Sequence, residues 1–295
     1  LTYISRKSGR AVVAAAGNEG NRGHHFYGTV PSETGYMDVE LRVGPGETGF
    51  QVNLWGNAPG LFVTEVIAPS GDRISRITPQ VLSRERYDFV FENTMLDVQY
   101  ELSEVISGDE RILLAFQNPT AGIWTIRIYS VGNLEKGFHM WLPVTGFISS
   151  ETYFIQSDPD TTVTEPANAE GVLTFAGYDA RTNSIWYDSG RGYTRTGKVV
   201  PDVAAPAVEV CTIDMRGRNS TLTGTSAAAA LGAGACALLL EWGIVQQNAP
   251  AMDSVTIQRY LIRGASRSEN YTYPNKTWGY GLLDLYGVFQ AIRGI

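Results

Sequence analysis

Residues 11–20 read Ala-Val-Val-Ala-Ala-Ala-Gly-Asn-Glu-Gly, and this stretch decides the fold class. Ala11 to Ala16 form a continuous apolar run without polar alternation, which is typical of a strand buried on both faces of a parallel sheet. Asn18 follows just beyond the carboxyl end of that predicted strand, at the edge where α/β proteins form their sites. Its side-chain N–H is suited to stabilise an oxyanion. An asparagine beside glycines is also a common turn residue.

A second stretch that can carry chemistry is Gly224-Thr225-Ser226, which opens an apolar run from Ala227 to Leu240. This run is shorter than the roughly 20 residues that span a bilayer and predicts a buried helix over residues 226–242. Unpaired backbone N–H groups at a helix N-terminus favour negative charge, which suits a serine nucleophile whose attack creates an oxyanion. The alternative for Ser226 is an ordinary N-cap, a position that serine prefers.

The segment from residue 21 to 151 has a different character. Apolar and polar residues alternate over short stretches between turns rich in Gly, Pro, Asn and Asp. The predicted strands are Met37–Val43, Gly49–Trp55, Leu61–Ile67, Tyr87–Glu92, Val98–Val105, Arg111–Gln117, Trp124–Ser130 and Phe138–Leu142. Short strands separated by turn signals predict an antiparallel β-sandwich, and specifically a jelly roll.

The flanking segments, 1–20 and 152–295, have the character of an α/β protein. Residues 1–7 predict the last turns of a helix. Beyond the sandwich, the predicted strands are Gly171–Tyr178 and Val199–Ala205, and the predicted further helices are Val255–Arg263 and Gly281–Arg293. We therefore expect a parallel-sheet α/β domain, built from residues 1–20 and 152–295, with the sandwich of residues 21–151 inserted into it.

Composition excludes several classes of protein. The chain has 295 residues, 43% of them hydrophobic and 18% charged, so wholesale disorder is excluded. The net charge of −7 argues against a nucleic-acid binder. Residues 36–150 hold 14 acidic and 8 basic residues, a net of −6, which we interpret as a solvated acidic surface rather than a cation site. Two cysteines, Cys211 and Cys236, are too few for a disulfide scaffold or a zinc site and are expected to be buried thiols.

Together, Ala15-Ala16-Gly17-Asn18-Glu19-Gly20 and Gly224-Thr225-Ser226 resemble the oxyanion-asparagine and nucleophile segments of the subtilisin-like serine proteases. Other stretches that resemble this family are Pro166–Asn168, Gly171–Tyr178, Lys198–Pro206 and Trp278–Asp284. The chain departs from the family where many members have Met-Ala-Ala-Pro-His after the serine, because it has alanines up to Ala230 and then Leu231.

The alanine run and the inserted sandwich resemble a narrower group, the clostridial Csp germination proteases. That resemblance implies a serine endopeptidase that processes the precursor of a spore-cortex hydrolase, and a spore-associated or extracellular location. Some members of the group are catalytically inactive pseudoproteases, so a scaffold that binds partners in germination signalling is the alternative. A third reading makes the sandwich a carbohydrate- or partner-binding module.

The resemblance also implies residue roles. Ser226 is the expected nucleophile, and the Asn18 amide and the Ser226 N–H are the expected oxyanion hole. Ala14, Ala15 and Ala16 form one wall of the substrate pocket by the same resemblance, with plain core packing as the alternative. The expected ligand is a protein or peptide substrate. No cofactor is identified, and calcium, common in the wider family, has no dense Asp/Asn run that would place it.

A serine nucleophile needs a base and an orienting acid. His24 and His25 are expected to be surface or interface residues, His139 a strand residue, and Asp188, in the motif-like Asp-Ser-Gly, a loop residue. The chain begins at Leu1, without an initiator Met or a signal-peptide pattern. We therefore expect a C-terminal portion that folds against a separate or missing N-terminal half of the protease domain. The alternative is a fragment that folds alone with an incomplete sheet.

Overall fold

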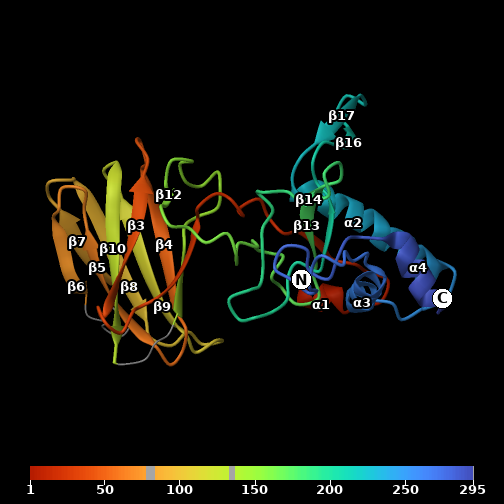
Figure 1. Ribbon diagram of the computed structural model, residues 1–295, viewed down its shortest axis with the longest axis horizontal. Coiled ribbons are helices and arrows are strands. Elements are labelled where there is room, and N and C mark those ends of the chain that lie inside the picture. The colour runs from red at the N-terminus through yellow and green to blue at the C-terminus, as the bar shows by residue number, and fades with distance from the viewer. Residues whose placement is uncertain (78–83, 133–136, 295) are drawn as a thin grey trace. The chain divides into compact units, whose positions relative to one another are not determined.

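The computed structural model describes residues 1–77, 84–132 and 137–294, which form two compact units (Figure 1). One unit combines Leu1–Asn21 with Pro159–Ile295, and the other is Arg22–Asp158. The second unit is therefore inserted between the two segments of the first.

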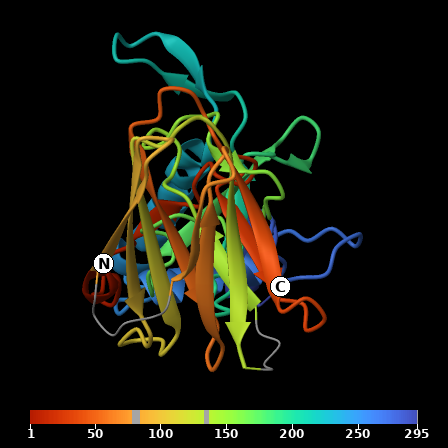
Figure 2. The ribbon, with the colours of Figure 1, turned by 90° about the vertical axis from the view of Figure 1, so that its left-hand side faces the viewer.

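The inserted unit is an antiparallel β-sandwich of two sheets (Figure 2). In spatial order, one sheet contains β12 (Tyr153–Phe154), β3 (Tyr36–Val43), β10 (Gly122–Val131), β5 (Leu61–Ile67) and β6 (Arg73–Ile77). The other contains β2 (His25–Thr29), β11 (Gly137–Trp141), β4 (Gly49–Gly56), β9 (Glu110–Gln117), β8 (Thr94–Glu101) and β7 (Arg84–Phe89). The sandwich is thus observed, whereas its jelly-roll class stays a prediction.

Each of the eight predicted strands overlaps an observed one, with two clear displacements. The strand expected at Tyr87–Glu92 ends at Phe89, and the one expected at Val98–Val105 starts at Thr94. Strands β2, β6 and β12 were not expected. β6 is short and mostly exposed, and β12 has two residues, so neither shows the long alternation on which the prediction depends.

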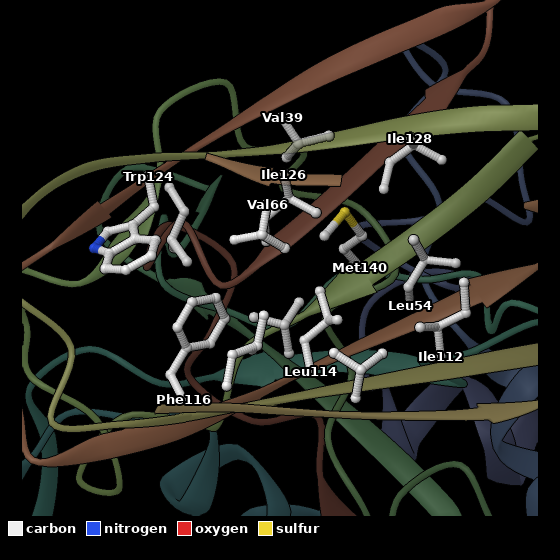
Figure 3. Close-up of a cluster of buried hydrophobic side chains, with 14 of the residues drawn as sticks. Val39, Leu54, Val66, Ile112, Leu114, Phe116, Trp124, Ile126, Ile128 and Met140 are labelled. Carbon is white, nitrogen blue, oxygen red and sulfur yellow. The ribbon is translucent and has the colours of Figure 1, made fainter. Parts of the chain in front are cut away.

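Alternation along the strands builds the core of the sandwich. On β10, Trp124, Ile126 and Ile128 are fully buried, while the residues between them face outward. Their partners across the interior include Leu114 and Phe116 from β9 in the opposite sheet (Figure 3). The apolar faces of the two sheets therefore pack against each other, as in other sandwiches.

The first unit has a short parallel sheet at its centre. β13 (Leu173–Asp179) pairs in parallel with β1 (Val13–Ala15) and with β15 (Val203–Pro206), while β14 (Ser184–Ile185) pairs antiparallel with its end. The prediction that the 11–16 run is buried on both faces holds only in part, since Val13 and Ala15 are half-buried. Within the described residues β1 is an edge strand with one partner, which leaves that side less covered.

The first unit also contains helices. They are α1 (Thr2–Ser5), α2 (Thr225–Leu240), which continues as a π-helical turn η1 (Glu241–Val245), α3 (Ser254–Gly264) and α4 (Leu285–Arg293). Of these helices, α2 and α3 contact the sheet. α2 lies directly on β13, because a Cβ at Gly232 would overlap the ring of Phe175. Asp253 and Asp284 cap α3 and α4 by accepting the N–H groups of Thr256 and Gly287.

The helix over 226–242 is confirmed, but its complete burial is not. Leu231 and Leu238 are 40% and 50% exposed, because only one side of α2 faces the sheet. Among the described residues, one helical stretch, Thr225–Val245, is long and apolar enough to cross a membrane by length and composition. The core helix of a soluble protein passes the same test.

The expectation that both thiols are buried is wrong for Cys211. It lies on β16 (Val210–Ile213), which pairs with β17 (Asn219–Leu222) in a hairpin that projects from the first unit in Figure 1. Both strands are largely exposed because a two-stranded hairpin has no interior of its own. Cys236 is buried inside α2, and burial raises the pKa of its thiol to about 12.

Candidate active site

Ser226 lies at the amino end of α2. The helix begins after Gly224, whose φ of 144° suits glycine, and its first backbone bond runs from the Ala227 N–H to the Gly224 carbonyl. Ser226 is exposed, and its hydroxyl has no hydrogen-bond partner within residues 1–77, 84–132 and 137–294. Its backbone N–H is among the first four of the helix, which have no intrahelical acceptor. The hydroxyl and an N–H are thus both available at one place.

Asn18, which follows β1, contacts the same end of α2. Its Oδ1 accepts hydrogen bonds from the N–H of Thr225 at 3.1 Å and from the hydroxyl of Thr225 at 2.8 Å. Gly224 supplies no side-chain cap, so Asn18 does the capping instead. Oδ1 is thus occupied, and the donor Nδ2 has no hydrogen-bond partner among the residues described.

The segment that carries Asn18 is held from two sides. Thr164 donates its N–H to the Ala16 carbonyl, and a Cβ at Gly17, whose φ is 93°, would overlap the Thr164 side chain. From the other side, Gly190 donates to the Gly17 carbonyl at 2.8 Å, and Gly20 donates to the Asp188 carbonyl at 3.0 Å. Asp188 is therefore a turn residue, as expected, and its backbone helps to position the asparagine.

The three alanines before Asn18 lie on both faces of β1. Ala14 and Ala16 are buried in a small apolar cluster with Val163 and Val200, while Ala15 is half-buried on the opposite face. Core packing accounts for Ala14 and Ala16. Their role as a pocket wall stays a prediction.

All three histidines belong to the sandwich unit. His24 and His25 were expected to be surface or interface residues. They are 6% and 1% exposed, which contradicts the surface alternative alone. His25 is on β2, and its Nε2 lies 2.9 Å from Nδ1 of His139 on β11. Their rings stack with each other and with Trp141. Aromatic packing between paired strands therefore explains their burial.

A buried carboxyl group, Asp202, supports the sheet beneath the site. It accepts the Thr174 N–H of β13 at 2.7 Å and the side-chain N–H of Gln258 on α3 at 2.7 Å. Burial raises its pKa to about 6. Sequence reasoning did not assign a role to Asp202 or to Thr225. For Thr225, the only signal was its place between Gly224 and Ser226.

The chain was then compared with known proteins. The subtilase family (Peptidase S8) matches residues 106–281, which is more than half of the chain and includes Ser226. The chain belongs to the subtilase family. Among curated proteins, this subtilase is 25% identical over 254 residues to a C5a peptidase of Streptococcus pyogenes and 26% identical over 255 residues to that of serotype M1. Each match covers 80% of this chain and 21% of the peptidase.

Among solved structures, the CspB protease of Clostridium perfringens matches this subtilase with a TM-score of 0.91 at 30% identity. The match covers 99% of this chain and 61% of the CspB chain. The subtilase chain thus spans about a fifth of the C5a peptidases and about three-fifths of CspB. The subtilisin-like fold expected from the sequence is confirmed by this similarity.

Proposed function

We propose that this subtilase chain belongs to a serine endopeptidase that hydrolyses peptide bonds through an acyl-enzyme on Ser226. One observation carries the proposal: Asn18 and Ser226, distant in sequence, converge at the amino end of α2. In this proposal the Ser226 hydroxyl attacks the scissile carbonyl, and Asn18 Nδ2 and the Ser226 N–H stabilise the resulting oxyanion. The capping bonds from Thr225 support it, because they orient the amide with its donor unpaired.

The base and the acid of the triad are proposed to come from polypeptide outside these 295 residues. His25 and His139 are buried in the sandwich and contact each other, which argues against either as the base. The described sheet has an open edge at β1, where further parallel strands of the same domain would pair. The CspB chain, of which 39% lies outside the match, supports the proposal that this domain has a further part.

The proposed substrate is a protein segment bound in extended form, since main-chain pairing is a common way to hold a peptide. The similarity to CspB supports a narrower proposal, processing of the precursor of a spore-cortex hydrolase. In that reading the sandwich is a jelly roll embedded in the protease domain.

Labelling the complete protein with a fluorophosphonate tests the proposed activity. We expect a covalent adduct on Ser226 and none on a Ser226→Ala variant. An intact fold without an adduct on the natural protein would overturn the proposal and favour a pseudoprotease scaffold. Circular dichroism of both proteins shows whether the fold is intact.

A further inference from the structure

We propose that Ser189 is a positioning residue for the Asn18 amide, because its hydroxyl ends the pairing of β1 with β13 at the point that lets Asn18 reach α2. The proposal rests on the proposed function, in which Asn18 is the oxyanion donor, and it names the side chain that sets the place of that donor. Ser189 lies in the turn that follows β14 and is completely buried. It acts through the path of the backbone and not by contact with a reacting atom.

The hydrogen bonds between β1 and β13 follow a regular parallel ladder as far as Ala16. Ala15 lies opposite Phe175, and the Ala16 N–H donates to the Phe175 carbonyl at 2.9 Å. Bonds in a parallel ladder alternate between the strands at even spacing. The next regular bond of this ladder would therefore run from the Gly177 N–H to the Ala16 carbonyl.

Both groups of that next bond are satisfied elsewhere. The Gly177 N–H donates to Oγ of Ser189 at 3.0 Å, and the Ala16 carbonyl accepts the Thr164 N–H at 3.0 Å. A buried N–H needs an acceptor, so the Ser189 hydroxyl takes the place of the next carbonyl of β1. Because the chain is no longer paired with β13 after Ala16, it can leave the sheet, and Asn18 can cap α2.

The residue after Ser189 contacts the departing chain. Gly190 donates its N–H to the Gly17 carbonyl at 2.8 Å. A Cβ at Gly190 would overlap the Ala16 carbonyl oxygen, so this turn lies directly against the backbone that leads to Asn18. Ser189 thus binds β13 while Gly190 binds the Asn18 segment. We call these two residues the Ser189–Gly190 wedge.

Removal of the Ser189 hydroxyl detaches the Ser189–Gly190 wedge from β13 and leaves the Gly177 N–H without its acceptor. A buried N–H in this state is costly. The acceptor that the ladder offers is the Ala16 carbonyl, because a carbonyl oxygen has two lone pairs and can accept a second bond. Pairing then continues by one bond, which draws Asn18 toward β13 and away from Thr225. We therefore expect a displaced oxyanion donor.

A second buried serine provides a matched control at the other end of β1. Oγ of Ser254 accepts the Val12 N–H at 3.3 Å and donates to the Gly171 carbonyl at 2.6 Å. It therefore bridges two groups that a regular ladder would join directly. Both serines are 0% exposed. Loss of either hydroxyl disturbs the pairing of β1, but only the Ser189 end adjoins Asn18.

The kinetics of fluorophosphonate labelling of Ser226 in the complete protein test the proposal. Ser189→Ala is expected to lower the rate constant of the covalent step by about 10- to 100-fold, because a displaced donor weakens the transition state. The binding constant of the reagent should stay within about twofold. Ser254→Ala is expected to keep the natural rate. A natural rate in Ser189→Ala, or an equal loss in both variants, overturns the proposal.

A double-mutant cycle shows whether Ser189 acts through Asn18. In an Asn18→Ala background no donor is left to displace, so Ser189→Ala should lower the rate further by less than about twofold. A full additional loss in that background contradicts the proposal. Circular dichroism reports the fold of every variant. If Ser189→Ala does not fold, Ser189→Cys replaces it, because a thiol fills the same place with a weak acceptor. That variant should lose at least about threefold in rate, and a natural rate overturns the proposal.

Hydrogen exchange separates this proposal from the proposed function. The Thr225 N–H, which donates to Oδ1 of Asn18, is expected to exchange severalfold faster in Ser189→Ala than in Ser254→Ala or the natural protein. This measurement does not depend on catalysis. If the natural protein forms no adduct on Ser226, the proposed function fails, while the exchange at Thr225 still decides the positioning role. Unchanged exchange in Ser189→Ala removes that role.

Discussion

Asn18 and Thr225 are 207 positions apart, yet Oδ1 of Asn18 accepts both the N–H and the hydroxyl of Thr225. This contact links the end of β1 to the start of α2. The oxygen of the Asn18 amide caps the helix, and in the proposed function its nitrogen has a second role as the oxyanion donor. The two roles can be separated by substitution.

Asn18→Asp is expected to keep the cap and lose the oxyanion donor, whereas Asn18→Leu loses both. In subtilisin, a member of this family, removing one such donor lowers kcat by about 10²–10³-fold, and we expect a loss of that order in both variants of the complete protein. Loss of the cap in Asn18→Leu also lowers the free energy of unfolding by about 1 kcal/mol. Full peptidase activity in Asn18→Asp would contradict the assignment. Thermal unfolding of the two variants measures the cap separately.

Ser226→Ala is expected to abolish covalent labelling without harming the fold. The hydroxyl is exposed and has no partner among the described residues, so its removal should change the free energy of unfolding by less than about 0.5 kcal/mol. Urea unfolding of both proteins is the measurement. A clear loss of stability would mean that the Ser226 hydroxyl makes a structural contact and is not a free nucleophile.

Glu110 is expected to make the sandwich less stable at alkaline pH. One of its oxygens accepts the Phe62 N–H at 2.7 Å, the other is buried without a hydrogen bond within the described residues, and burial raises its pKa from 4.5 to about 7. A raised pKa means that the fold favours the protonated form. The contribution of Glu110 to the free energy of unfolding is therefore full below pH 4.5 and is lost as the pH rises through about 7. The total loss reaches at most about 3 kcal/mol.

Glu110→Gln tests this pH dependence, because glutamine keeps the acceptor for Phe62 and cannot ionise. Urea unfolding at pH 5 and pH 8 should show a smaller difference in the variant than in the natural chain. Glu40→Gln, at an exposed position of β3, is the control and should leave the difference unchanged. An unchanged difference in Glu110→Gln would show that other groups cause it.

Two glycines of α2 are expected to respond oppositely to alanine. At Gly232 the added methyl would overlap the Phe175 ring, and overpacking of this kind lowers the free energy of unfolding by about 1–3 kcal/mol. A methyl group added at Gly234 would have no neighbouring atom within 4 Å. The better helix propensity of alanine should therefore raise the free energy of unfolding by up to about 1 kcal/mol. Thermal unfolding of the 295-residue chain compares the two. A destabilising Gly234→Ala would contradict the open space around Gly234.

The sequence was most informative where a local pattern has one physical meaning. The apolar run before Asn18 predicted a parallel strand, and the alternation in residues 37–142 predicted strands that pair antiparallel. It was least informative for β2 and β12, whose pairing depends on partners far along the chain. The burial of His25 within the sandwich was missed for that reason, since nothing local shows that β2 joins β11.

The α2 helix shows both sides of this limit. Its apolar composition correctly predicted a helix, and it also suggested complete burial, which the structure does not show. An apolar composition predicts a helix that is buried on all sides. It does not show which of its sides pack against other residues of this chain.

The sequence by itself determined most of the longer elements and the family, because periodicity and motif are local properties of a chain. It determined the candidate residues Asn18 and Ser226 by their motifs. Only the tertiary structure decided that Oδ1 of Asn18 binds Thr225, which leaves the amide nitrogen as the donor, and that one face of α2 is bare. The Asn18–Thr225 contact joins residues more than 200 positions apart, and the exposure of α2 depends on which segments pack against it. Such contacts are set by tertiary packing rather than by any local pattern.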